Sequence, residues 1–152
     1  MQLYVLDRCP IKAAEMLAEF PRRAMATNLR EGQQILSVCL HERGLPTLLK
    51  QDGSRYSGVN HKNHPLVRWF AEKDSRVDWL LWHLDYHTAN FYLKHWQALR
   101  WWYDTCEATV FDREIPDLDS VPWFPAKEYE GPAGDIKIYL EWKYGTKKET
   151  NK

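Results

Sequence analysis

The fold of this chain is decided by its tryptophan-rich stretch, Val77-Asp-Trp-Leu-Leu-Trp-His-Leu-Asp-Tyr-His-Thr-Ala-Asn-Phe-Tyr-Leu-Lys-His-Trp-Gln-Ala-Leu-Arg-Trp-Trp-Tyr103. Apolar residues recur along it at spacings of three and four, the period of an α-helix. The tryptophans widen the apolar stripe nearly all the way round, so we expect this helix to lie at the centre of the core. Ser75 and Asp78 have the spacing of a capping box that would start it, and Thr88-Ala89-Asn90 is where we expect a bend or a split.

Three further helices are predicted before this one. The first begins at Pro10, since proline favours the first helical position, and runs to about Phe20. The second spans 22–43 and ends at Gly44. Its buried side is formed by residues three or four apart, namely Met25, Leu29, Gly32, Leu36 and Cys39. A short third helix starts at Pro65.

The other segments are read from composition. Residues 44–64 are rich in Gly, Ser, Asn and Asp and predict a long loop. Residues 105–134 are acidic and punctuated by proline, which is typical of an extended strap over the core. Leu3 to Leu6 is a short β-prone run. The segment 136–144 fits two patterns: a strand that would pair with Leu3 to Leu6, or a helix capped by Asp135.

Together these patterns predict a mainly α fold. We expect a compact single-domain helical bundle over residues 1–146, with a long central Trp-rich helix and a minor β element, followed by a disordered tail at 147–152. A chain of 152 residues that is 44% hydrophobic can bury one sizeable core but hardly two.

Charge and cysteine usage narrow the function classes. The formal net charge is zero, so the chain is not a polycation that coats nucleic acid by bulk attraction. Residues 22–76 nevertheless hold ten basic against five acidic side chains, and residues 104–141 hold three against ten. The three cysteines form no CxxC pair, which excludes a disulfide framework or zinc knuckle. No signal sequence and no run of about 20 apolar residues is present, so we expect a cytoplasmic protein without membrane contact.

The best candidate site is the polar loop that starts at Tyr56 and leads into the helix at Pro65. Its imidazole, amide and cationic groups can donate hydrogen bonds to phosphates or base edges. With basic residues of the second helix it would form a nucleic-acid-binding groove, whose wider set includes Lys50, Arg55 and His61. The residues that we expect to bind nucleic acid are Arg22, Arg23, Arg30, Tyr56, Asn60, Lys62, Arg68 and Trp69. Glu31 and His64 are the candidate catalytic acid–base groups.

Other chemistry is less favoured. His83 and His87 lie four residues apart on the Trp-rich helix, a spacing that can place two imidazoles on one metal, but no HExxH pattern accompanies them. We expect packed histidines, no metal site and no cofactor. Cys39 lies on the apolar side of its helix and is expected to be inert.

The chain resembles a set of small phage-encoded proteins, most of them without an assigned function. The shared features are Leu6-Asp7 with Pro10, Ala13-Ala14, Arg30-Glu31-Gly-Gln-Gln34, Lys62-Asn-His-Pro65 with Trp69, Asp78-Trp79-Leu80, and Ile138-Tyr139-Leu140. This similarity covers most of the chain. It departs from the pattern at Pro21-Arg22-Arg23, where an Asp-Lys-His segment is usual in those proteins.

Two shorter pieces are similar to the pyrimidine-dimer DNA glycosylases, which are compact helical enzymes that flip a nucleotide. These pieces are Ala18-Glu19-Phe20-Pro21-Arg22 and Asn63-His64-Pro65. The family's Arg-Glu step in the first helix is absent here, and Gln2 leaves no small residue to provide the N-terminal amine nucleophile. The resemblance therefore implies a fold directed at DNA rather than the lyase reaction itself.

Taken together, the loop and the resemblances predict a phage accessory protein that binds or acts on DNA, with glycosylase-like base recognition if it is an enzyme. The alternative is a noncatalytic phage protein that binds and modulates a host protein through its Trp-rich or acidic surface. The sequence leaves open which base, lesion or host protein is recognised, and the oligomeric state.

Overall fold

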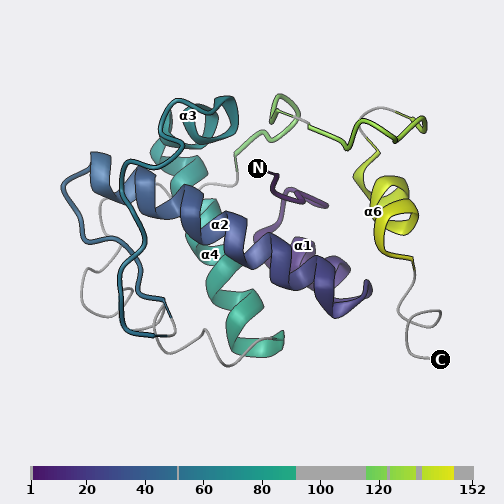
Figure 1. Cartoon of the computed structure of the whole chain (residues 1–152), viewed down its shortest axis with the longest axis horizontal. Coiled ribbons are helices and arrows are strands. Elements are labelled where there is room, and N and C mark those ends of the chain that lie inside the picture. The colour runs from purple at the N-terminus through teal and green to yellow at the C-terminus, as the bar shows by residue number, and fades with distance from the viewer. Residues whose placement is uncertain (1, 51, 92–115, 123, 133–134, 146–152) are drawn as a thin grey trace.

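The computed structural model describes residues 2–50, 52–91, 116–122, 124–132 and 135–145. These residues form five helices, α1 (Pro10–Leu17), α2 (Arg22–Glu42), α3 (Pro65–Ala71), α4 (Asp74–Phe91) and α6 (Ile136–Tyr144) (Figure 1). Within the described ranges, β structure is limited to an isolated antiparallel bridge between Leu49 and Arg55. The mainly helical fold predicted from the sequence is confirmed.

Helix α2 buries the side that its periodicity predicted. Met25, Leu29, Leu36 and Cys39 are each at most 7% exposed. Gly32 lies on the same side, and a Cβ there would come 2.8 Å from a methyl group of Leu84 on α4. The absence of a side chain at this position therefore lets α4 pack closely against α2.

Helix α4 is the central element of the described core, because α1, α2 and α3 all pack against it. It begins at Asp74, so Ser75 lies inside its first turn and the predicted capping box is wrong. It continues without a split through Thr88-Ala89-Asn90, where the Thr88 hydroxyl donates to the Leu84 carbonyl at 2.9 Å. The rest of the predicted Trp-rich helix, 92–103, lies outside the described residues.

The last described element is a helix, so the strand alternative for 136–144 is wrong. Asp135 caps α6 by accepting a hydrogen bond from the Ile138 backbone N–H at 3.1 Å. Leu3 to Leu6 consequently has no strand partner in this segment and has no regular secondary structure. The predicted minor β element is reduced to the bridge in the loop after α2.

The N-terminal segment joins two hydrophobic clusters. Leu3 packs into the cluster around α2 and α4, whereas Tyr4 packs into a second cluster with Tyr139 and Tyr144 of α6. The Tyr4 backbone N–H donates to Asn28 Oδ1 at 2.8 Å, and its hydroxyl lies 2.9 Å from that of Tyr144. Because these two neighbouring residues belong to different clusters, the N-terminal segment ties the clusters together.

The described part of the predicted acidic strap is non-helical, as its prolines indicated. Leu118 anchors it in the core at 5% exposure, and Ser120 accepts a hydrogen bond from Trp69 Nε1 at 3.1 Å.

Helix α1 ends at Leu17, three residues earlier than predicted, and residues 18–20 form a turn. None of the described helices is long and apolar enough to cross a membrane.

Candidate functional site

The loop between α2 and α3 folds back onto α2. The Leu48 N–H donates to Ser37 Oγ at 3.2 Å, and the Tyr56 hydroxyl donates to Gln33 Oε1 at 2.7 Å. Gly58 lies directly on His41, because a Cβ at this position would overlap the imidazole. The loop is therefore anchored along more than two turns of the helix.

A tight hairpin within this loop brings Lys50 and Arg55 together. The Tyr56 N–H donates to the Leu48 carbonyl at 2.9 Å, and the Lys50 N–H donates to the Ser54 carbonyl at 2.7 Å. Asp52 closes the turn, since its Oδ1 accepts from both the backbone and the hydroxyl of Ser54. These hydrogen bonds lower the pKa of the Asp52 carboxyl, and the Lys50 charge adds to the effect.

The chain after the hairpin turns back toward the same place. Ser57 Oγ accepts hydrogen bonds from the backbone N–H groups of Val59 and Asn60 at 3.1 and 3.0 Å. Because the oxygen acts as an acceptor in both bonds, the hydroxyl proton remains to be donated. His61 follows with a left-handed backbone, φ 61°, which turns the chain toward α3.

These turns and α2 line a solvent-open cavity of about 250 Å³, which we call the Lys50 cavity. It is lined by Gln34, Lys50, Arg55, Tyr56, Ser57, Asn60 and His61. Two of these side chains are cations and none is acidic. Arg55 is oriented by a hydrogen bond to the Thr47 carbonyl at 2.6 Å, and the Lys50 ammonium lies 5.4 Å from the centre of the Tyr56 ring.

The sequence analysis found much of this lining but not all of it. Tyr56 and Asn60 belong to the predicted nucleic-acid-binding set, and Lys50, Arg55 and His61 to its wider groove. Gln34 and Ser57 were missed. Gln34 lies on the polar side of α2, which is a weak signal, and the role of Ser57 depends on hydrogen bonds that no pattern reveals.

Arg30 lies one turn before Gln34, near the edge of the Lys50 cavity. Burial raises the pKa of the Tyr56 hydroxyl, and the positive charge of Arg30 opposes that rise. Its guanidinium is also 3.7 Å from the Glu31 carboxylate. The side chain of Glu31 is 18% exposed and does not line the cavity.

His64 has a structural role that limits its chemistry. Its Nδ1 accepts a hydrogen bond from the Leu66 N–H at 3.1 Å and so caps α3. A neutral imidazole with Nδ1 as acceptor carries its proton on Nε2, so the capped ring can donate but cannot accept a proton from a substrate. Burial lowers the pKa of His64, which favours this neutral form. While the cap is intact, the predicted acid–base role of His64 is limited to donating the Nε2 proton.

The remaining predicted residues do not converge on the cavity. Arg22 and Arg23 begin α2, with Arg23 5.6 Å from the centre of the Tyr144 ring, whereas Arg68 pairs with Glu42 at the opposite end. A helix of this length spans roughly 30 Å, so one ligand phosphate cannot meet both ends. Lys62 is exposed and lies outside the lining.

Trp69 is covered by other groups. Its side chain is 9% exposed and its Nε1 binds Ser120, while the Arg76 guanidinium lies 3.8 Å from the centre of its ring. A base could stack on this ring only if Arg76 and the strap moved away, so the predicted contact of Trp69 with nucleic acid is blocked in the structure.

The histidines of α4 are buried in the core. His83 Nδ1 lies 3.0 Å from the Pro10 carbonyl and its Nε2 lies 3.0 Å from Asn28 Nδ2, which defines a neutral ring that donates at one nitrogen and accepts at the other. His87 is buried with no hydrogen-bond partner for either nitrogen among the described residues. Within the described ranges, no group of His, Cys, Asp or Glu could hold a metal ion.

Cys39 is chemically quiet, as its position on the apolar side of α2 predicted. The side chain is fully buried, and burial raises the pKa of its thiol to about 12. It therefore stays protonated at neutral pH and is a poor nucleophile.

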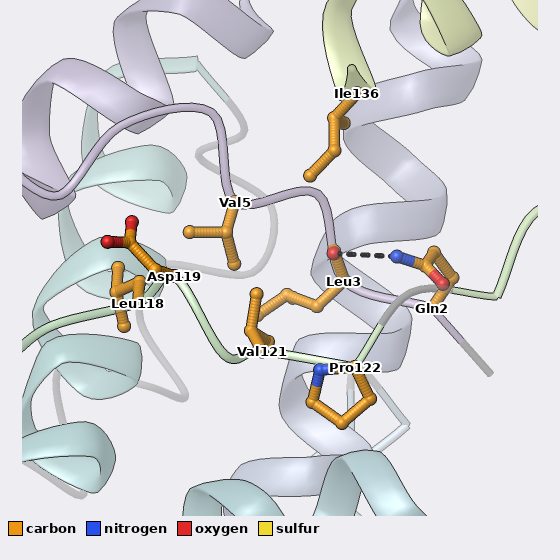
Figure 2. A pocket seen from close by; sticks show the side chains of 8 residues that line it. All are labelled: Gln2, Leu3, Val5, Leu118, Asp119, Val121, Pro122 and Ile136. Atoms are coloured by element: carbon orange, nitrogen blue, oxygen red, sulfur yellow. Dashed lines mark hydrogen bonds between the residues drawn. The ribbon is translucent and has the colours of Figure 1, made fainter. Parts of the chain in front are cut away.

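A second cavity of about 270 Å³ lies between the N-terminal segment, the strap and α6 (Figure 2). Six of its eight lining residues are apolar, and Leu3 and Val5 face Val121 and Ile136. The carboxylate of Asp119 points away from Leu3 in this view. This cavity therefore offers little directed chemistry, and the Lys50 cavity remains the candidate site.

Comparisons of the chain with family models, curated proteins and solved structures gave no match. The resemblances to phage-encoded proteins and to pyrimidine-dimer glycosylases therefore stay predictions, and the function has to be argued from the site.

Proposed function

We propose that this protein binds DNA through the Lys50 cavity, as a phage accessory protein acting in the host cytoplasm. The observation that carries the proposal is the lining itself. Lys50 and Arg55 supply two positive charges, Gln34, Ser57, Asn60 and His61 supply neutral donors, and no acidic side chain joins them. Charge-assisted hydrogen bonds from such a set are the usual means of holding a phosphate.

The surroundings favour an anionic partner as well. Arg30 lies beside the cavity edge, and residues 22–76 as a whole carry an excess of five positive charges. This local excess, set against zero formal charge for the molecule, supports an anionic partner without general polycationic binding.

If the protein is an enzyme on DNA, Glu31 is the better candidate for proton transfer. Its carboxylate is half-buried, is paired with Arg30 and lies one turn from Gln34. His64 would take part as a hydrogen-bond donor through Nε2. Base recognition by Tyr56 would require the Lys50 ammonium to move from its ring, since the two are in cation–π contact.

Binding can be tested by fluorescence anisotropy of a labelled oligonucleotide, measured for the wild type, Lys50→Gln and Arg55→Gln across a salt series. Each substitution removes one cation, so it should weaken binding and reduce the slope of log affinity against log salt by about 1. Lys137→Gln is the matched control, since it makes the same charge change on the exposed surface of α6. Equal affinity and slope for all four proteins would reject the proposal.

A protein-binding function is the second candidate, and exposed aromatic residues favour it. Ile138 and Trp142 lie one turn apart on α6 and are 41% and 49% exposed, and Phe124 of the strap is 39% exposed. Exposed tryptophans are frequent anchors of interfaces. Under this proposal the wild type and Lys50→Gln retain a host protein from lysate, whereas Trp142→Ser does not. Equal retention by Trp142→Ser and the wild type would contradict the proposal.

A further inference from the structure

Residues 117–121 of the strap, which we call the cover segment, lie against Trp69. Ser120 Oγ accepts a hydrogen bond from Trp69 Nε1 at 3.1 Å, and Leu118 is buried in the same hydrophobic cluster as Trp69. The Arg76 guanidinium lies 3.8 Å from the centre of the Trp69 ring. The cover segment therefore occupies the indole N–H of an aromatic ring that also carries a cation.

The cover segment brings negative charge to two cations. Asp117 and Asp119 are its charged residues, and both are exposed. The hydrogen bond from the Asp119 N–H lowers the pKa of the Asp117 carboxyl, and the charges of Arg8 and Arg76 lower it further. Arg8 is exposed, and its carbonyl accepts a hydrogen bond from Nε1 of Trp79, one turn beyond Arg76 on α4. A carboxylate thus lies near two cations that could otherwise bind phosphate.

Arg76 is incompletely paired while the cover segment is in place. Its Nη1 donates to the Trp69 carbonyl at 2.7 Å and lies 3.3 Å from the Glu72 carboxylate. Its Nε is buried with no hydrogen-bond partner among the described residues, which costs free energy. Glu72 is a weak counter-ion, because its side chain is 66% exposed. A nucleic-acid phosphate that reached Arg76 would supply the acceptors that this arrangement lacks.

The packing beneath the cover segment is also incomplete. Leu118 and Val121 line the cavity of about 270 Å³ together with Leu3 and Val5 of the N-terminal segment (Figure 2). Atoms that line a cavity lack dispersion contacts that close packing would provide. The cover segment contains no helix or strand, so it can be displaced without breaking a regular element.

We propose that the cover segment is autoinhibitory: it occupies a second nucleic-acid-binding surface, formed by Arg8, Trp69 and Arg76, and a single DNA strand displaces it. The inference rests on the proposed function for its choice of DNA, and it adds a surface outside the Lys50 cavity. When the cover segment leaves, Arg8 and Arg76 bind phosphates and the indole N–H of Trp69 becomes a free donor. The plane of the Arg76 guanidinium offers a surface on which an unpaired base can stack.

The first test is the affinity of Asp117→Asn for a labelled single-stranded oligonucleotide, measured by fluorescence anisotropy. Asparagine keeps the side-chain oxygen that accepts from the Asp119 N–H but removes the negative charge. We expect binding to be about two- to fivefold tighter at low salt, the range of an exposed ion pair, with a smaller gain at high salt. Glu130→Gln is the matched control, since it removes an exposed acid from another part of the strap. An equal gain in both variants would overturn the inference.

A double variant shows whether the gain comes from this surface. Arg8 is exposed, so Arg8→Gln should leave the fold intact, as circular dichroism can verify. Asp117→Asn combined with Arg8→Gln should bind no more tightly than the wild type, and a full gain in the double variant would overturn the inference. Hydrogen exchange reports displacement directly: with oligonucleotide bound, the amides of 117–121 should exchange faster while those of α4 stay protected.

Lys50→Gln separates this inference from the proposed function. If Lys50→Gln weakens binding, and DNA leaves exchange at 117–121 unchanged or slower in the wild type, the autoinhibitory role is overturned while DNA binding at the Lys50 cavity stands. If Lys50→Gln and Arg55→Gln bind as the wild type does, but Asp117→Asn binds more tightly and DNA accelerates exchange at 117–121, the Lys50 cavity is overturned and this inference holds. Absence of binding by both the wild type and Asp117→Asn would overturn both.

Discussion

Two histidines one turn apart on α4 show how much a single residue depends on its partners. His83 is enclosed by Asn28 and the Pro10 carbonyl, and both of its nitrogens are paired. His87 is equally buried, yet its nitrogens have no hydrogen-bond partner among the described residues. The sequence predicted that both would pack in the core, but their spacing could not show which one was paired, because the partners come from α1 and α2.

The two histidines should respond in opposite ways to the same substitution. His83→Leu removes the partner of Asn28 Nδ2 and the imidazole donor to the Pro10 carbonyl, and should lower the free energy of unfolding by about 1–3 kcal/mol. His87→Leu removes two unpaired polar atoms and should raise it by roughly 1 kcal/mol. Urea unfolding followed by tryptophan fluorescence measures both, and changes of the same sign would contradict this account.

Stability should also fall in acid because of this pair. Burial lowers the pKa of His83 to about 4 and that of His87 to about 3. Below the ordinary value of about 6.5, the unfolded chain binds protons that the folded chain does not, so stability is complete above that pH and is lost as pH falls toward 4. Each group contributes up to about 1.4 kcal/mol per pH unit in this window.

The measurement is urea unfolding between pH 7 and pH 4.5, with His87→Leu as the comparison that isolates one histidine from the titrating carboxylates. The variant should show a shallower decline than the wild type. Parallel curves for the two proteins would mean that His87 does not titrate as proposed.

At the scale of the elements, the residues at helix ends help to decide which segments are helical and where each helix begins. Periodicity located the buried side of α2: all five residues predicted for that side are buried, and the helix buries seven more. Periodicity could not decide 136–144, because the same residues fit both the alternation of a strand and one face of a helix. In the structure this segment is a helix, and Asp135 is its N-cap. The capping box predicted at Ser75 failed for the same reason, since a capping pattern inside the first turn of a helix looks the same as one at its start.

The cap of α3 offers a direct test of the role assigned to His64. His64→Ala removes the acceptor for the Leu66 N–H and should cost about 1 kcal/mol, whereas His64→Asn restores an acceptor and should recover most of the loss. Thermal unfolding measures both. Because the pKa of His64 is lowered, the contribution of this cap should be present at neutral pH and fade as the ring becomes protonated in acid. If His64→Ala unfolds at the same temperature as the wild type, His64 does not stabilise α3 as its cap.

The loop that forms the Lys50 cavity depends on two glycines for different reasons. Gly58 needs space, because a Cβ there overlaps His41, while Gly44 needs its backbone conformation, φ 74°, with no atom within 4 Å of a Cβ. Gly58→Ala should displace the loop and weaken DNA binding. Gly44→Ala should cost about 1 kcal/mol of stability through strain and leave binding unchanged.

Anisotropy titrations and limited proteolysis of the loop distinguish these two outcomes. If Gly58→Ala binds DNA as the wild type does, the packing of the loop on His41 is not what shapes the site.

Across the whole molecule, two hydrophobic clusters meet at Leu3 and Tyr4. Periodicity predicted the helical class and composition predicted one core. The division into two clusters was not visible in the sequence, since it depends on two neighbouring side chains that pack against different helices. The site shows the same limit. Sequence patterns located the loop and its cations, and only the fold showed that Gln33 fixes Tyr56 and that Arg23 and Arg68 lie at opposite ends of α2.

Tyr4→Ala should loosen α6 more than α4. The substitution removes the ring packed against Tyr139 and Tyr144 and the hydroxyl contact, but leaves Leu3 in its own cluster. Loss of a buried aromatic side chain costs about 3–5 kcal/mol. Hydrogen exchange should therefore accelerate at the α6 amides while α4 stays protected; uniform acceleration in both helices would mean that the clusters behave as one unit.

The Lys50 cavity takes six of its seven lining residues from one contiguous stretch of loop and only Gln34 from a helix. The helical core can therefore stay constant while this stretch alone is exchanged. Proteins that share such a scaffold would be free to diverge in ligand preference by replacing a dozen residues, and grafting a loop of different charge onto this chain would be a direct route to a new binding specificity.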